Sequence, residues 1–289
     1  MAILRNIQTK NYLIIAIIVV LFLCTDVWAE TGGQSMSTEG ISLIAIKTAN
    51  STFRISAWER PEVAVNLSGE NSIELLKIEK KDDRIEIEAS KSSPDMTEFN
   101  VSVPEDMNLE ITSMNGSIYV TGVNGKKKIE TFNGNVELSD VVGSISAKTF
   151  NGNIIADIRF DEKSDFNAVN GSIDIRVKDE FSVPISVNTV SGNITMTLPD
   201  GYSAEVDAST LSGQIFNELP LDGGPDGHSL KGKIFNGGPP LKLKTVSGLI
   251  YVIFLLFYFY QRLFLVFLVQ SFLQSIGCLQ MQLRSVGLI

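Results

Sequence analysis

Apolar and polar residues alternate with a period of two along most of the chain, which is the pattern of half-buried β-strands. The segments 53–56, 85–88 and 99–104 alternate in this way, and the third ends at Pro104, which cannot donate a hydrogen bond to a strand ladder. No run with helical periodicity precedes the apolar C-terminal tail. The pattern therefore predicts an all-β protein.

Seven glycines share one local sequence. The residue before each glycine is Asn or Ser, the residue two before is apolar, the residue three before is Ser, Thr or Ala, and the residue two after is Ile or Val. The glycines are Gly116, Gly134, Gly152, Gly171, Gly192, Gly213 and Gly248. Their spacing is 18, 18, 19, 21 and 21 residues, followed by a gap of 35. Such self-similarity predicts a repeat architecture.

Each position of the repeat has an expected role. Asn-Gly and Ser-Gly supply the positive φ that a tight change of direction needs. The β-branched residue that follows opens the next strand and faces the core. This core row consists of Ile118, Val136, Ile154, Ile173, Ile194 and Ile215. Gly125 and Gly143 fall between the main glycines, which predicts a turn every nine residues.

Two architectures use such turns. In an antiparallel meander each Asn-Gly would be a two-residue hairpin turn. In a β-solenoid each repeat is one coil, so that Asn and Thr recur at the same corner and form ladders along the axis. The solenoid explains the recurrence more directly, and we expect a β-solenoid over 106–250, preceded by a small β-strand region over 41–105. The long gap holds a loop at 222–227 and, at 234–237, a phrase that resembles half of a degenerate copy.

Two stretches resemble the bacterial DUF4097 family. They are Phe-Asn-Val-Ser-Val-Pro at 99–104 and Leu-Glu-Ile-Thr-Ser-Met-Asn-Gly-Ser-Ile-Tyr-Val at 109–120. The resemblance extends over roughly residues 41–250 and is most specific in the glycine phrases. It implies a β-solenoid-like fold in exported or envelope-associated bacterial proteins, often labelled adhesins, and it implies no catalytic residue.

Both ends of the chain are apolar. Arg5 and Lys10 precede the apolar run 12–24, and small residues lead to Ala29, which predicts a signal peptide over 1–29 and then a polar linker over 30–40. Acylation of Cys24 and an uncleaved anchor are the alternatives. At the other end, residues 251–289 form an apolar tail that contains Arg262. This tail is either a membrane anchor or the product of a changed reading frame near Leu249, and the sequence leaves both open.

The chemistry-bearing residues are few. Between residues 30 and 248 there are 20 Lys and Arg against 32 Asp and Glu, which argues against nucleic acid as a partner. We expect the basic run 126–128 to be a solvated turn and the single histidine, His228, to be a surface residue. The two cysteines lie in the apolar ends, which excludes disulfide bonds and zinc clusters from the region between. No hydrolase, metalloprotease or phosphate-loop motif occurs.

Polysaccharide cleavage and calcium binding have little support in the sequence. Asp157, Asp174 and Arg176 are the best candidates for polysaccharide cleavage, but a solvated outer face of alternating charge explains them more simply. The Asp-Gly pairs at 200, 222 and 226 do not form a calcium-binding nonapeptide array. We therefore expect no enzyme activity, no metal and no cofactor.

The sequence thus predicts an exported, non-catalytic β-repeat protein. Its expected role is that of an adhesin or envelope scaffold that binds a protein or glycan at the cell surface. The alternatives are a self-assembling envelope protein, which associates through the open ends of the stack, and a polysaccharide-active enzyme. Phe132 and Phe150 stand at equivalent corners and form either an exposed aromatic ridge for a partner or an internal packing pair.

Overall fold

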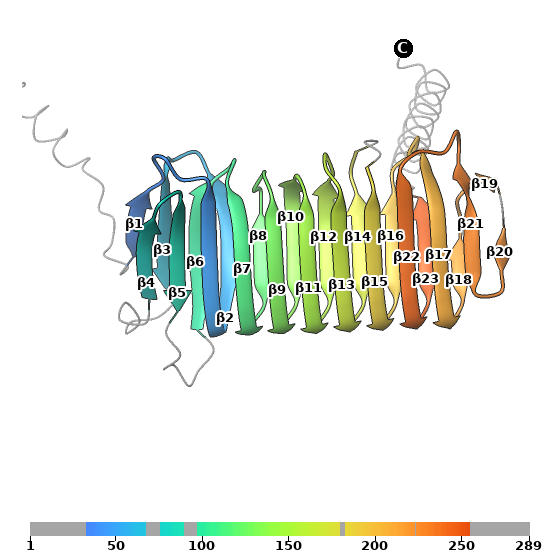
Figure 1. The fold of residues 1–289 in the computed structure, drawn as a ribbon, viewed down its shortest axis with the longest axis horizontal. Coiled ribbons are helices and arrows are strands. Elements are labelled where there is room, and N and C mark those ends of the chain that lie inside the picture. The colour runs from blue at the N-terminus through green and yellow to red at the C-terminus, as the bar shows by residue number, and fades with distance from the viewer. Residues whose placement is uncertain (1–32, 68–75, 90–96, 180–182, 223, 255–289) are drawn as a thin grey trace, which may run out of the picture.

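The computed structural model describes residues 33–67, 76–89, 97–179, 183–222 and 224–254. Within these ranges the regular structure is β-strand throughout. Figure 1 shows an elongated stack of strands that lie side by side. The stack is a β-solenoid, as predicted, and each coil gives one strand to each of two sheets, called sheet A and sheet B. Neighbouring coils pair in parallel at equivalent positions of the repeat.

Sheet B contains the strands that lead into the glycine corner. In stacking order its parallel strands are β5 (Arg84–Ala89), β2 (Leu43–Trp58), β7 (Asn108–Asn115), β9 (Lys127–Asn133), β11 (Ile145–Asn151), β13 (Ser164–Asn170), β15 (Ile185–Ser191), β22 (Pro240–Ser247) and β17 (Ala204–Ser212). β4 (Leu76–Lys81) pairs antiparallel with β5 at one end, and β21 (Ser229–Ile234) pairs antiparallel with β17 at the other. The short strands β19 (Leu221–Asp222) and β20 (Pro225–Asp226) lie on β21.

Sheet A contains the strands that leave the corner. Its parallel strands are β6 (Thr97–Pro104), the second half of β2, β8 (Ile118–Thr121), β10 (Val136–Val142), β12 (Ile154–Arg159), β14 (Ile173–Val177), β16 (Ile194–Leu198), β23 (Ile250–Phe254) and β18 (Ile215–Asn217). β3 (Glu62–Leu67) and β1 (Gln34–Ser37) close its first end as antiparallel strands. β2 passes through both sheets, so the region 41–105 continues the stack of coils.

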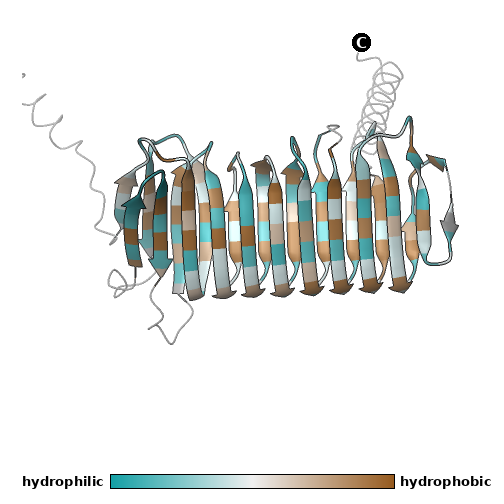
Figure 2. Cartoon of the chain, viewed as in Figure 1, coloured by the Kyte–Doolittle hydropathy of each residue, from teal (hydrophilic) through white to brown (hydrophobic). Residues whose placement is uncertain are grey.

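The core fills the space between the two sheets. Inward side chains alternate with outward ones along each strand, which Figure 2 shows as bands of apolar residues that cross the stack. All six residues of the predicted core row are buried, at 0–8% exposure, and Ile250 joins that row between Ile194 and Ile215. Burying a side chain of this size contributes roughly 1.5–3 kcal/mol, so each added coil brings its own increment of core.

The order of the coils departs from the order of the sequence. β22 pairs with β15 on one side and with β17 on the other, and β23 lies between β16 and β18 in the same way. The coil around Gly248 is therefore inserted between the coils of Gly192 and Gly213. The sequence suggested that residues 234–237 are half of a degenerate coil, and this is wrong. The segment is a turn with positive φ at Phe235 (52°) and Gly237 (73°) that leads from β21 into β22.

The predicted linker over 30–40 needs correction, and the predictions for the two apolar ends lie outside the described ranges. The segment 30–40 is not a plain linker, because it contains β1, whose Met36 packs against the core while Ser35 and Ser37 point outward. The predicted signal peptide, 1–29, and residues 255–289 of the tail lie outside the described residues. Leu249 to Phe254 continue the stack in register, and Val252 is buried. Among the described residues, no helix is long and apolar enough to cross a membrane.

Candidate functional site

The corner between sheet B and sheet A is the most regular surface of the molecule. At each corner glycine the neighbouring coil approaches so closely that a Cβ would lie 1.8–2.1 Å from a backbone carbonyl oxygen of that coil. Only Gly116 of the seven has φ in the positive range, at 147°. The predicted positive φ is therefore wrong for the other six, where glycine is needed for the close approach of stacked backbones. Gly125 (87°) and Gly143 (114°) at the opposite edge do have positive φ, and the predicted turn every nine residues is confirmed.

Side-chain ladders join the corners. Asn133 donates to the Asn115 side chain at 2.7 Å, Asn151 donates to Asn133 at 2.7 Å, and Asn170 continues the row at 2.9 Å. The predicted asparagine ladder is thus present. The corner threonines bond differently from the expected threonine ladder, because each hydroxyl donates to the glycine carbonyl of the neighbouring coil, as Thr149 does to Gly134 at 3.0 Å. These bonds hold successive corners in fixed register.

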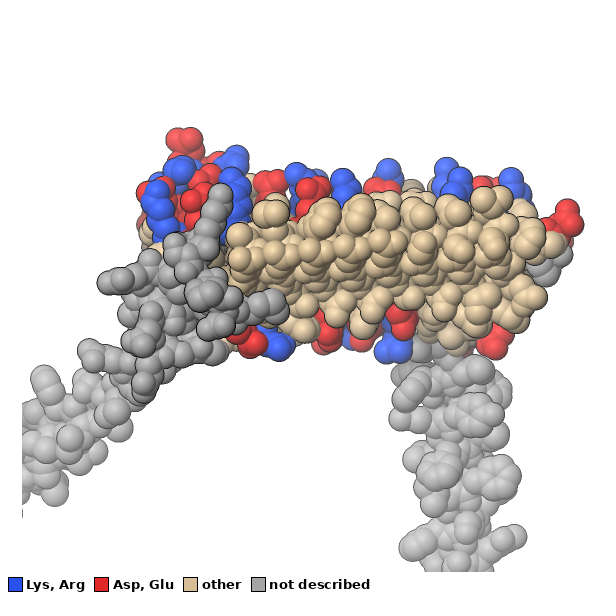
Figure 3. Space-filling model, turned by 90° about the horizontal axis from the view of Figure 1, so that it is seen from below, with Lys and Arg blue, Asp and Glu red and all other residues tan. Residues whose placement is uncertain are grey.

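A row of exposed apolar side chains, here called the corner row, runs beside the asparagine ladder. It occupies the position two residues before each glycine. Its members, with their exposed fractions where large, are Met114 (59%), Phe132 (49%), Phe150 (42%), Val169, Val190 (45%), Val246 (44%) and Leu211 (75%). Figure 3 shows the corner as a long strip without charged side chains, bordered on both sides by mixed acidic and basic residues.

Phe132 and Phe150 lie at the surface of the corner row. Their ring centroids are 4.7 Å apart and the ring planes differ by 5°, so the two rings stack face to face along the axis of the solenoid. Both rings are close to half exposed, and internal packing does not describe them. Because the rings cover one another's faces, the pair presents mainly its apolar edges to solvent.

The structure does not bring the three candidate catalytic residues together as one group. Register pairs Asp157 with Arg176, whereas Asp174 lies beside Ile155 one row away. Asp157 is bound by the Lys178 ammonium at 3.2 Å, which also contacts Asp140 at 2.6 Å. The hydrogen bond from Lys178 lowers the pKa of Asp140 below its ordinary value. These charges neutralise one another, although Oδ1 of Asp157 is buried without a hydrogen-bond partner in the described part of the chain.

The other candidates are similarly accounted for. His228 is exposed, and its Nδ1 lies 2.9 Å from the carbonyl oxygen of Gly213. The described residues contain no group of three or more His, Cys, Asp or Glu side chains that would hold a metal ion.

Sequence analysis identified the corner glycines and the two phenylalanines, but it did not single out the remaining members of the corner row as a surface. Their common position in the repeat was the signal that could have found them.

The basic run 126–128 is not the solvated turn that we expected. Lys126 and Lys128 are exposed and pair with Glu162 and Glu110, but Lys127 is only 2% exposed. It occupies an inward position, and its Nζ donates to the carbonyl oxygens of Gly125 and Val142. Burial lowers the pKa of Lys127 to about 8, against the smaller opposing effect of a nearby carboxylate.

Comparison with known proteins adds a family and several similar folds. The family model described as Toastrack DUF4097 matches residues 100–252. A "putative adhesin" from Bacteroides fragilis NCTC 9343 is 11% identical, with a TM-score of 0.45 over 77% of this chain and 96% of that one. A "putative cell adhesion protein" from Clostridium sporogenes ATCC 15579 is 16% identical, with a TM-score of 0.35 over 77% and 97%. A "putative lipid binding protein" from Parabacteroides distasonis ATCC 8503 is 14% identical, with a TM-score of 0.39 over 76% and 95%. No curated protein matches the chain.

Proposed function

The chain belongs to the Toastrack DUF4097 family, as its sequence suggested, and from this premise we propose that it is a non-catalytic binding module that attaches to a partner surface through its corner. In this role it serves as an adhesin or as a scaffold of the cell envelope. The observation that carries the proposal is the corner row, an uncharged strip of exposed apolar side chains bordered by charge. Exposed apolar patches with a polar rim are characteristic of interaction sites.

The dimensions of the corner suit an extended contact. From Met114 to Leu211 the row crosses six inter-strand steps, which at roughly 4.8 Å each gives a straight strip of about 29 Å. The ladders already fix the corner, so a partner does not have to order it on binding, and little conformational entropy is lost.

A second copy of the chain is a poor partner for this strip. A contact about 29 Å long and as wide as the spacing between two packed sheets, about 10 Å, covers about 300 Å² on each copy, whereas a stable dimer buries about 800 Å² per partner. Binding through a single corner is therefore weak, and attachment gains strength when many copies act on one surface.

Export fits the same proposal. The expected signal peptide, 1–29, would deliver the chain to the envelope or beyond it. β23 runs from the corner at Ile250 to the opposite edge of the stack at Phe254. If the tail that follows is a membrane anchor, it begins at the edge of the stack opposite the corner row.

The rival role of end-to-end assembly has less support. Antiparallel strands lie at both ends of the stack, and the outermost strand of sheet B at the first end, β4, carries Lys77, Lys80 and Lys81. Short edges and lysine-rich edges oppose pairing with another chain. The enzymatic alternative has only paired charges at Asp157 to support it.

The test compares attachment by corner and non-corner variants. Surface-displayed full chain is challenged with glycan arrays and with protein-coated surfaces. The double change Phe132→Ser and Phe150→Ser should lower attachment about tenfold, because two partly buried aromatic contacts are lost. Ile155→Ser removes a similarly exposed apolar residue (48%) from sheet A and should leave attachment unchanged. Equal loss in both variants, or attachment that is unaffected by the double change, would refute the corner as the binding surface.

A further inference from the structure

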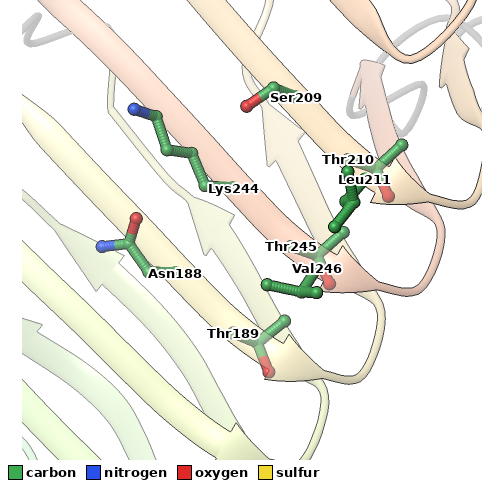
Figure 4. A pocket seen from close by; sticks show the side chains of 8 residues that line it. All are labelled: Asn188, Thr189, Ser209, Thr210, Leu211, Lys244, Thr245 and Val246. Atoms are coloured by element: carbon green, nitrogen blue, oxygen red, sulfur yellow. The ribbon is translucent and has the colours of Figure 1, made fainter.

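A hollow of about 460 Å³ lies on the outer face of sheet B where the inserted strand β22 runs between β15 and β17 (Figure 4). Its lining residues are Asn188, Thr189, Ser209, Thr210, Leu211, Lys244, Thr245 and Val246. Asn188, Ser209 and Lys244 form one end of the hollow, and Leu211 and Val246 lie at the other, next to the corner (Figure 4). The hollow is therefore polar at one end and apolar at the other.

The polar end contains a cation that lacks a carboxylate partner among the described residues. Lys244 stands between Asn188 and Ser209 in the register of the sheet, and both neighbours are neutral. Lys148 occupies the equivalent position on β11 and is paired with Glu130 at 3.3 Å. An ammonium without a carboxylate partner can bind an anionic ligand group.

The apolar end opens onto the corner row. Val246 and Leu211 are 44% and 75% exposed, and Val190 continues the row on the next strand at 45%. From Val246 the row extends over five further strands to Met114, a path of roughly 24 Å. An unbranched apolar chain that starts in the hollow can follow this path without meeting a charged side chain.

We infer that the hollow binds an alkyl carboxylate, with its carboxylate at Lys244 and its chain along the corner row. The Ser209 hydroxyl lies beside the ammonium and can donate to a carboxylate oxygen, whereas the Asn188 amide already donates to Asn167 at 3.1 Å and to Ser186 at 3.2 Å. A single ammonium suits a monocarboxylate better than a polyanion, which needs clustered cations. The inference goes beyond the proposed attachment to a partner surface, and it depends on Lys244, which attachment through the corner does not require.

The test uses the full chain in nanodiscs of zwitterionic phosphatidylcholine, which keep its apolar ends in solution. A photoreactive decanoate is crosslinked to the chain, and the labelled peptides are mapped. We expect labelling on β22 and β17, competed by decanoate and not by decanol or decyltrimethylammonium. A competitor that is two methylenes longer should compete at a roughly fourfold lower concentration, because about half of the added methylene surface would be covered by the protein.

Matched variants separate a specific site from general partitioning into lipid. Lys244→Gln should raise the half-saturating concentration roughly three- to tenfold, because a charge-assisted contact is lost. Lys148→Gln changes the equivalent position outside the hollow and should leave it unchanged. An apolar peptide with a free C-terminus, tested against its amide, distinguishes a peptide carboxylate from a free fatty acid as the source. Equal labelling of both lysine variants, or equal competition by decanol, would overturn the proposal. The Phe132 and Phe150 double variant retains the hollow, so failure of attachment and failure of this site are distinguishable.

Discussion

Replacing Lys127 by methionine should stabilise the fold and remove a pH dependence of its stability. Lys127 stands in an inward row of sheet B between Leu109 and Ile145, where neighbouring coils place aliphatic side chains. A methionine has nearly the same length and shape, and it needs no hydrogen bond. We expect the variant to be about 1–2 kcal/mol more stable at neutral pH, a gain limited by the two carbonyl groups that lose their donor.

The pH dependence gives the sharper test. The folded pKa of Lys127 is about 8, and the ordinary value is 10.5. Because the folded value is the lower one, the unfolded chain binds more protons between these values, and stability rises with pH across that window. At about 1.4 kcal/mol per pKa unit, the wild-type chain gains about 3 kcal/mol over the whole window and about 2.5 kcal/mol between pH 7 and 10. Below pH 8 the cost of the buried charge is present almost in full.

The assay is urea unfolding of residues 33–254, followed by circular dichroism at several pH values from 7 to 10. The methionine variant contains every other titrating group, so the difference in unfolding free energy between the two chains isolates Lys127. The stability of the variant minus that of the wild-type chain should fall by about 2–3 kcal/mol as the pH rises from 7 to 10, so that it reverses sign and the wild-type chain is the more stable one at pH 10. The raised pKa of Tyr202, about 12, affects both chains equally. A difference that stays constant with pH, or a less stable variant at pH 7, would show that Lys127 is not the buried cation described here.

Two further predictions concern the corner. Gly152→Ala should destabilise the fold by about 3 kcal/mol or more and lower its thermal midpoint, because the added Cβ would lie 2.0 Å from the Gly134 carbonyl oxygen. Gly224→Ala is the control, because its Cβ would enter open space, and it should leave the thermal midpoint nearly unchanged. Equal midpoints for the two variants would contradict close stacking as the reason for glycine. Asn133→Ala removes one donor and one acceptor of the asparagine ladder, so it should lower the free energy of unfolding, measured by chemical denaturation, by about 1–2 kcal/mol. An unchanged free energy of unfolding would mean that water replaces the ladder without cost.

The sequence predicted the architecture because the repeat encodes it directly. Alternation placed the core row, and the recurrence of one corner phrase indicated coils stacked in register. The role of the glycines was misjudged, because a local rule about φ cannot detect a carbonyl oxygen from another coil, as at Gly152. Lys127 was misjudged for a related reason. Three consecutive lysines in a sequence suggest a solvated segment, whereas the alternation of side chains in a strand turns the middle lysine toward the core.

The inserted coil has a physical cause that the repeat alone does not reveal. Strand β17 has two edges, and β21 occupies one of them as an antiparallel partner. The chain that returns as β22 must then take the other edge, which lies between β17 and β15. Insertion is compatible with the register because Thr245 bonds the Gly192 carbonyl at 3.0 Å and Thr210 bonds the Gly248 carbonyl at 3.1 Å. The same step places Lys244 between two neutral residues, so the hollow proposed to bind a carboxylate arises from the order of the coils and from no motif in the sequence.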